Sequence, residues 1–306
     1  MSTTSTGSSS RPEAAPPGRS VPHTAADVAA RLAELKVRPT KRRGQSFLID
    51  PFVADAEAAL AAEGRPARIV EVGGGLGILT EALLRRGVRS LTVIEREPAL
   101  ARFLRETFGS AIEVVEGDAL TAELPRGATL VGNLPFSVGT PILERVWKAR
   151  MPRFVGMLQR EVADRIAAPP GSRTYGRLSI AAALYGSPQL FQTVPSSSFA
   201  PAPQVEGRVL TFTARRGRLP VPSVPAFERA VATLFSARRK QLGNLLPRLV
   251  PREAVDATAA AVGWPVGWAK LRPEALPPEA FFRLAVELER RGAGAGRPRV
   301  PSERHP

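Results

Sequence analysis

Four segments of the sequence carry residue types that could bind a ligand or do chemistry, and each follows a short apolar run. They are a glycine turn from Gly73 to Gly77, the acids Glu95 and Asp118, and the segment Asn133-Leu-Pro-Phe136. Glycine lets a backbone pass close to a ligand, and a helix that begins there offers unpaired N–H groups and a positive dipole end. By itself, the turn also suits an ordinary strand-to-helix connection.

The spacing of the glycines narrows the choice of ligand. A dinucleotide-binding fingerprint requires its third glycine where this chain has Ile78. Here the glycines stand at alternate positions, 73, 75 and 77. This spacing resembles that of the class I S-adenosylmethionine (SAM) methyltransferases.

Glu95 and Asp118 suit the same cofactor. Glu95 stands 18 residues after Gly77 and ends an apolar run, so its carboxylate could accept hydrogen bonds from both ribose hydroxyls of a nucleoside. Asp118 could accept one from the exocyclic amine of the adenine. Either acid alone could be the solvated end of a strand. Together with Gly73 and Gly75, the two acids predict a SAM site.

The segment from Asn133 to Phe136 combines a carboxamide, a proline and an aromatic ring. Methylation of an exocyclic amine needs such groups, because the lone pair of that nitrogen is delocalised into the base. The side-chain oxygen of Asn133 and the main-chain carbonyl of Leu134 could accept both N–H hydrogens, and Phe136 could stack on a flipped base. Orientation and electrostatics would then suffice without a general base. The alternative is a strand-ending turn with a core phenylalanine.

The composition bounds the partners and the chemistry. The 306 residues include 43 Lys and Arg against 28 Asp and Glu, a net charge of +15. This charge favours nucleic acid as the partner, although a solvated basic surface is the alternative. The chain has no Cys, and its two His, His23 and His305, lie near the termini. We therefore expect no disulfide and no metal site. We also expect a cytoplasmic protein without a secretory signal or membrane span.

Apolar periodicity predicts the elements that must position these groups. Strands and helices alternate, which favours a parallel sheet covered by helices on both faces. Ligands of such sheets bind at the carboxyl ends of the strands, where the four segments fall. The expected strands are 68–72, 91–94, 112–115, 130–131, 154–158, 190–194 and 209–213, and the expected helices are 25–35, 52–62, 78–86, 98–108, 140–148, 161–168 and 178–185.

Composition divides the chain into four parts. Residues 1–22 are rich in Ser, Thr, Pro and Gly and are expected to be a disordered tail. Residues 23–220 hold the alternating elements, whereas residues 221–290 show only helical patterns, so a small all-α domain is expected to follow the α/β domain. Residues 291–306 form a basic tail that is expected to be disordered. Lys41, Arg42 and Arg43 suit either a phosphate-contacting arm or a solvated linker.

The chain resembles the KsgA family of ribosomal RNA adenine dimethyltransferases from about residue 37 to residue 288. The segments that carry this resemblance begin with Lys41-Arg-Arg-Gly-Gln-Ser-Phe-Leu48 and include 71–80, 93–95, 117–119, 132–136, 158–162, 175–179 and 199–205. In the C-terminal part they are 238–240, 242–246, 271–276 and Phe281. These last segments are more similar to the KsgA branch than to the related Erm methyltransferases.

This resemblance implies a Rossmann-like class I SAM methyltransferase fold with a small C-terminal all-α domain. It implies N6-dimethylation of two adjacent adenines near the 3′ end of small-subunit (16S) rRNA, late in 30S biogenesis. The partner would be the pre-30S subunit, and we expect a monomer. By the same resemblance, the methionine end of SAM would be lined by Gln45, Ser46, Leu48 and Gly73. Phe199 would be a second wall of the base pocket, and Arg238, Arg239 and Lys240 would contact rRNA phosphates.

Three residues depart from the usual family pattern. Ser46 stands where the family usually has Asn, which shortens one hydrogen-bonding arm. Gly74 replaces a frequent Pro and suggests a more flexible turn. Phe136 replaces a frequent Tyr, so that only stacking remains. These departures permit a diverged, resistance-type role.

Two other functions remain open. One is an Erm-type enzyme that methylates a 23S rRNA adenine and confers macrolide resistance. The other is a non-catalytic ribosome-assembly factor that uses SAM weakly or not at all, against which Glu95, Asp118 and Asn133 argue. A DNA adenine methyltransferase is disfavoured, because such enzymes usually place proline where this chain has Leu134.

Overall fold

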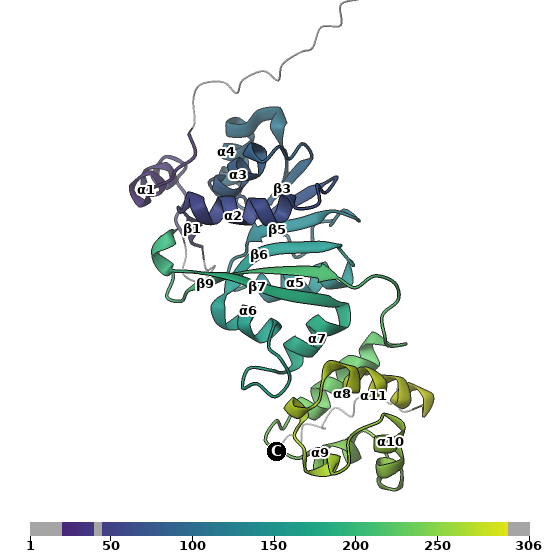
Figure 1. Ribbon diagram of the computed structural model, residues 1–306. Coiled ribbons are helices and arrows are strands. Elements are labelled where there is room, and N and C mark those ends of the chain that lie inside the picture. Colours follow the sequence, from purple (N-terminus) through teal and green to yellow (C-terminus); the bar gives the residue numbers. More distant parts are fainter. Residues whose placement is uncertain (1–19, 40–44, 293–306) are drawn as a thin grey trace, which may run out of the picture.

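The computed structural model describes residues 20–39 and 45–292 (Figure 1). A seven-stranded sheet forms its centre, in the order β4-β3-β2-β5-β6-β9-β7. The strands of this sheet are β2 (Ile69–Val72), β3 (Leu91–Glu95), β4 (Glu113–Glu116), β5 (Thr129–Asn133), β6 (Arg153–Gln159), β7 (Gly186–Val194) and β9 (Gly207–Ala214). This alternating α/β architecture confirms the predicted fold class.

One strand of the sheet runs against the others. Strands β2 to β6 pair in parallel, whereas β9 is antiparallel to both β6 and β7. The prediction of a parallel sheet is therefore wrong for β9. The physical reason is the connection: residues 195–206 between β7 and β9 hold no crossover helix, and a parallel pair would need one.

Helices cover both faces of the sheet, and two apolar clusters mark the two interfaces. On one face lie α2 (Pro51–Ala62) and α3 (Ile78–Arg85), with α4 (Pro98–Phe108) beside them. On the other lie α5 (Gly139–Lys148), α6 (Arg160–Ile166) and α7 (Arg177–Tyr185). Helix α2 begins directly after Asp50, which caps it. The carboxylate of Asp50 accepts hydrogen bonds from the backbone N–H groups of Phe52 and Val53 at 3.0 and 3.4 Å.

A second, two-stranded sheet was not predicted. Strand β1 (Phe47–Leu48) pairs antiparallel with β8 (Phe199–Ala200). Two-residue strands show no alternation, so periodicity could not reveal them. The pairing brings the segment that follows residue 45 against a segment some 150 residues later in the chain, and both of these segments line the site described below.

The C-terminal part is helical, as predicted, and Figure 1 shows it beyond α7. It contains α8 (Val224–Phe235), α9 (Leu242–Leu245), α10 (Val255–Ala261) and α11 (Pro278–Arg290). Its apolar side chains continue the cluster beneath α5 and α7. The hydroxyl of Tyr175 also donates to the carbonyl of Leu276 at 3.0 Å.

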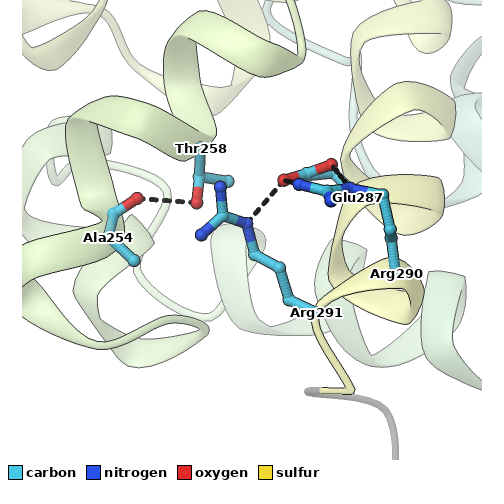
Figure 2. A network of polar contacts seen from close by, with 5 residues as sticks. All are labelled: Ala254, Thr258, Glu287, Arg290 and Arg291. Carbon is cyan, nitrogen blue, oxygen red and sulfur yellow. Dashed lines mark hydrogen bonds and ion pairs between the residues drawn. The ribbon is translucent and has the colours of Figure 1, made fainter.

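A polar network closes the end of α11 (Figure 2). The carboxylate of Glu287 accepts from Arg290 at 2.8 and 2.9 Å and from Arg291 at 2.5 Å. These hydrogen bonds, the one from Arg290 first, lower the pKa of Glu287 to about 2. Nearby, the Thr258 hydroxyl donates to the carbonyl of Ala254 at 2.7 Å. Arg291, which the sequence places in the basic tail, thus belongs to this network.

The tail predictions fall mostly outside the described residues, as do Lys41, Arg42 and Arg43. Val21 is described and is buried against the core near α2 and α3. Val21, which the sequence assigns to the N-terminal tail, therefore packs against the core. Within the described part of the chain, no helix is both long and apolar enough to cross a bilayer.

Candidate active site

Two adjoining hollows lie at the carboxyl ends of the central strands, and three residues, Gln45, Gly73 and Pro135, line both. The first hollow is lined by the glycine turn, by the segment from Asn133 to Phe136 and by β1 and Phe199. The second is lined by Glu95 and Asp118 among others. The structure thus brings together the predicted cofactor and base-binding residues Gln45, Ser46, Leu48, Gly73, Gly75, Glu95, Asp118, Asn133, Leu134, Phe136 and Phe199.

The glycine turn connects β2 to α3 with left-handed backbone at Gly73 and Gly75, whose φ angles are +76° and +55°. A Cβ at Gly73 would meet no atom within 4 Å, so the backbone there faces open space. Gly74 is different, since a Cβ there would lie 2.5 Å from Cγ1 of Val93. Core side chains occupy the space that a side chain at Gly74 would need, so close packing accounts for glycine at this position.

Glu95 is held beside this turn. Its carboxylate accepts from the backbone N–H of Gly75 at 3.0 Å and from that of Glu97 at 2.8 Å. The side chain is buried, and burial raises its pKa, although these backbone hydrogen bonds act in the opposite direction. The carboxylate is fixed in place while lining the second hollow.

Asp118 lies two residues after β4, on the other side of the second hollow. One carboxylate oxygen accepts from the backbone N–H of Leu120 at 2.9 Å. The other pairs with Arg96 at 3.3 Å. Glu95 and Asp118 therefore present acceptors to one hollow from two neighbouring strand ends, as the sequence predicted.

Asn133 is the last residue of β5, and its carboxamide meets a buried acid that sequence analysis missed. Glu57 of α2 is fully buried. Of the two orientations of the carboxamide, the one with Nδ2 toward Glu57 lets that nitrogen donate to both carboxyl oxygens, at 2.9 and 2.7 Å. Burial, and then repulsion from Glu71, raise the pKa of Glu57 to about 8, against the effect of the Asn133 hydrogen bond.

Glu71, a second buried acid that was missed, lies in the middle of β2 and lines the first hollow. Its carboxyl accepts from the hydroxyl of Thr80 at 2.7 Å. Burial raises its pKa to about 7, and the nearby Glu95 adds to the rise.

Both missed acids left a signal in the sequence. Glu71 interrupts the apolar run of a strand that is buried along its whole length. Glu57 stands on the helix face otherwise formed by Val53, Ala54, Ala58 and Ala61. A charge at a core-facing position is rarely tolerated unless it is partnered.

The predicted RNA-contacting cations near residue 240 do not line either hollow. Arg238 donates to the carbonyl of Ser172 at 3.2 Å and lies 3.9 Å from a carboxylate oxygen of Glu274. It thereby joins the end of α8 to the loop before α7. Arg239 and Lys240 are exposed. Among the described residues, no group of His or acidic side chains is arranged as a metal site.

Comparison with known proteins gives a consistent result. A profile of the family described as Ribosomal RNA adenine dimethylase matches residues 38–275. A probable ribosomal RNA small subunit methyltransferase A from Natronomonas pharaonis is 38% identical over 267 residues, covering 85% of this chain and 97% of the relative. The ribosomal RNA small subunit methyltransferase A of Deinococcus radiodurans is 40% identical over 260 residues, covering 82% and 87%.

Solved structures support the same fold. The crystal structure of the 23S rRNA methyltransferase ErmE is similar with a TM-score of 0.64 at 27% identity, over 79% of this chain and 99% of that one. The fold is that of the class I SAM methyltransferases, as predicted. On the extent of the profile match and the identity to these relatives, the chain belongs to the ribosomal RNA adenine dimethylase family.

Proposed function

We propose that this protein transfers methyl groups from SAM to N6 of two adjacent adenines near the 3′ end of small-subunit rRNA, giving dimethyladenosine. The observation that carries the proposal is the position of Asn133. Its carboxamide lines one hollow together with Phe136 and Phe199, directly beside the hollow of Glu95 and Asp118. The names of the relatives, which are small subunit methyltransferases, supply the choice of RNA.

The residues of the second hollow fit SAM. Glu95 would accept from the ribose hydroxyls, and Asp118 would accept from the adenine amine. The open space at Gly73 leaves room for the methionine end, which Gln45, Ser46 and Leu48 would flank. Bound there, SAM supplies a methyl group activated by a positively charged sulfur.

The residues of the first hollow would prepare the target amine. The side-chain oxygen of Asn133 and the carbonyl of Leu134 would each accept one of its N–H hydrogens. The lone pair of the nitrogen is then freed from the ring and becomes nucleophilic. Phe136 and Phe199 would hold the splayed-out base by stacking. Such a site works by orientation and electrostatics and requires no histidine.

The basic charge suits an RNA partner. The net charge is +15, and the exposed Arg239 and Lys240 lie in the helical part of the chain. We assign them, with Arg238 and with Lys41, Arg42 and Arg43, to phosphate contacts. Structured RNA is recognised largely by shape and backbone, so an assembled pre-30S subunit in the cytoplasm is the proposed substrate, bound by a monomer.

An Erm-type function on 23S rRNA is the second candidate, favoured by the likeness to ErmE. Expression in a macrolide-sensitive host separates the two, since the proposed function predicts unchanged macrolide susceptibility. Isothermal titration with SAM tests the cofactor assignment. Binding with one site per chain is expected, whereas no binding would leave only the assembly-factor role.

A further inference from the structure

Asn133 can serve the proposed reaction in only one of its two amide orientations. The target amine is a donor, so Asn133 must present its oxygen, an acceptor, to the hollow. The opposite orientation would present Nδ2, a second donor, and the contact would become repulsive. Something in the protein must therefore select between two orientations that have the same shape.

Glu57 is placed to make that selection. Both of its carboxyl oxygens lie within hydrogen-bond distance of one terminal atom of the Asn133 carboxamide, at 2.9 and 2.7 Å when that atom is Nδ2. Glu57 is fully buried on α2, away from solvent. A burial of this kind is costly for a carboxyl, and a plain apolar side chain would fit the same helix face.

We infer that Glu57 is a positioning residue for Asn133: its carboxylate accepts from Nδ2 and so turns Oδ1 toward the target amine. The inference deepens the proposed function and rests on it. A carboxylate accepts only, so it admits one orientation. A neutral carboxyl can instead donate its O–H to Oδ1, which turns the amide round and presents Nδ2 to the hollow. The ionised form is the active one.

The electrostatic surroundings set where this change occurs. Burial and then the charge of Glu71 of β2 raise the pKa of Glu57 to about 8, and the charge of Glu95 of β3 in turn raises the pKa of Glu71. The other acids near Glu57 in the chain are occupied elsewhere. Asp55 of α2 pairs with Arg86, which follows α3, and Glu63, which follows α2, pairs with Arg153 of β6. The orientation of Asn133 is therefore sensitive to pH near neutrality.

The first test compares three variants with the wild type in single-turnover methyl transfer between pH 6.5 and 9.5. The wild-type rate should rise with pH through about 8. In Glu57→Gln this rise should be absent, because glutamine does not titrate and holds either orientation. In Glu57→Leu the rate should fall about tenfold or more at pH 9, with SAM affinity changed by less than about twofold. Asp55→Asn, on the outer side of the same helix, should match the wild type.

If Glu57 only stabilised the fold, Glu57→Leu would be slower because it is less stable. We expect the opposite change in stability: leucine removes a buried charge from this apolar face, so Glu57→Leu should melt at a higher temperature than the wild type at pH 9. A variant that is more stable yet slower places the effect on positioning. Wild-type rates in Glu57→Leu, or a pH rise retained in Glu57→Gln, would overturn the inference.

A second readout needs no substrate. The side-chain amide resonances of Asn133, identified by their loss in Asn133→Ala, should shift with pH near 8 in the wild type and stay constant in Glu57→Gln. Constant resonances in both proteins would contradict the inference even if transfer is observed. A wild type that methylates no RNA but shows the shift would instead count against the proposed function alone.

Discussion

The carboxamide of Asn133 lies between the buried carboxyl of Glu57 and the hollow lined by Phe136 and Phe199. In the proposed reaction it is the acceptor that makes the target nitrogen nucleophilic. Asn133→Ala should therefore lower the methyl-transfer rate by about 100- to 1000-fold, the usual effect of removing a group that stabilises developing charge. Calorimetry should show SAM affinity close to that of the wild type. Near-normal turnover in this variant would show that another group holds the amine.

Glu95 allows the corresponding prediction for the affinity of the cofactor SAM. Both of its oxygens already accept backbone N–H groups, so an amide in its place would set one N–H donor against another. Glu95→Gln should weaken SAM binding by about tenfold or more, measured by isothermal titration. Glu113→Gln, an exposed acid on β4, is the matched control and should bind SAM normally. Equal affinities in the two variants would exclude Glu95 from the cofactor site.

Among the individual residues of the site, the sequence predicted those that lie at strand ends and missed the buried acids Glu57 and Glu71. Glu95, Asp118 and Asn133 follow apolar runs, and the parallel sheet brings the ends of those runs together. The contact of Glu57 with Asn133 joins a helix to a strand that lies some 75 residues later in the chain, and no local spacing encodes it. Only the charge on a buried helix face hinted at it.

The turn between β2 and α3 allows a prediction at the scale of elements. Gly75 and Gly109 both have positive φ, +55° and +53°, where a side chain is strained, so alanine at either should cost about 1–3 kcal/mol in unfolding free energy. A Cβ at Gly75 would also lie 3.2 Å from the ring of Phe47 in β1, whereas one at Gly109 meets nothing within 4 Å. Gly75→Ala alone should weaken SAM binding. Equal SAM affinities in the two variants, by titration, would contradict this role of the turn.

The polar network of Glu287 at the end of α11 allows a second prediction at the scale of elements (Figure 2). The pKa of Glu287 is lowered, so its ion pairs stabilise the folded protein at pH values above 4.5, its ordinary pKa. This stabilisation is lost as the pH falls toward about 2. The contacts are partly exposed, so Glu287→Gln should cost only about 0.2–1 kcal/mol at pH 7. Urea unfolding should show a larger difference at pH 7 than at pH 3, where part of the difference remains because a carboxyl with a pKa of about 2 is still largely ionised in the folded protein. An equal difference at both values would contradict the assignment.

Most helices and strands could be predicted because their apolar periodicity is local. Helix α4 has the predicted bounds, and the other helices whose bounds were predicted, all before residue 220, differ by one or two residues at their ends. Strand β8 could not be predicted, because two residues carry no pattern and its partner β1 lies far away in sequence. The direction of β9 depends on the path of the preceding connection, and strand composition does not report it.

For the whole molecule, the buried acids predict how stability depends on pH. The pKa values of Glu57 and Glu71 are raised from 4.5 to about 8 and about 7. At pH values between the ordinary pKa and the raised pKa of each acid, the folded protein holds a proton that the unfolded chain releases. The unfolding free energy should therefore fall as pH rises from about 5 to about 8. The slope from each acid is at most about 1.4 kcal/mol per pH unit.

Urea unfolding at several pH values between 5 and 9 measures this slope. Glu57→Gln should flatten this slope, and Asp55→Asn should not, because Asp55 is half-exposed and its hydrogen bond with Arg86 lowers its pKa. An unchanged slope in Glu57→Gln would show that Glu57 is not protonated in the folded protein at neutral pH.

The α/β part and the helical part share a continuous apolar cluster, so the exposed Arg239 and Lys240 belong to the same packed body as the hollows. The measurement that tests the proposed function most directly is methyl transfer from labelled SAM to unmethylated 30S and 50S subunits, with mass spectrometry of the digested rRNA. We predict dimethyladenosine at two adjacent positions near the 3′ end of the 30S RNA. Label only in the 50S subunit would contradict this account and identify an Erm-type enzyme.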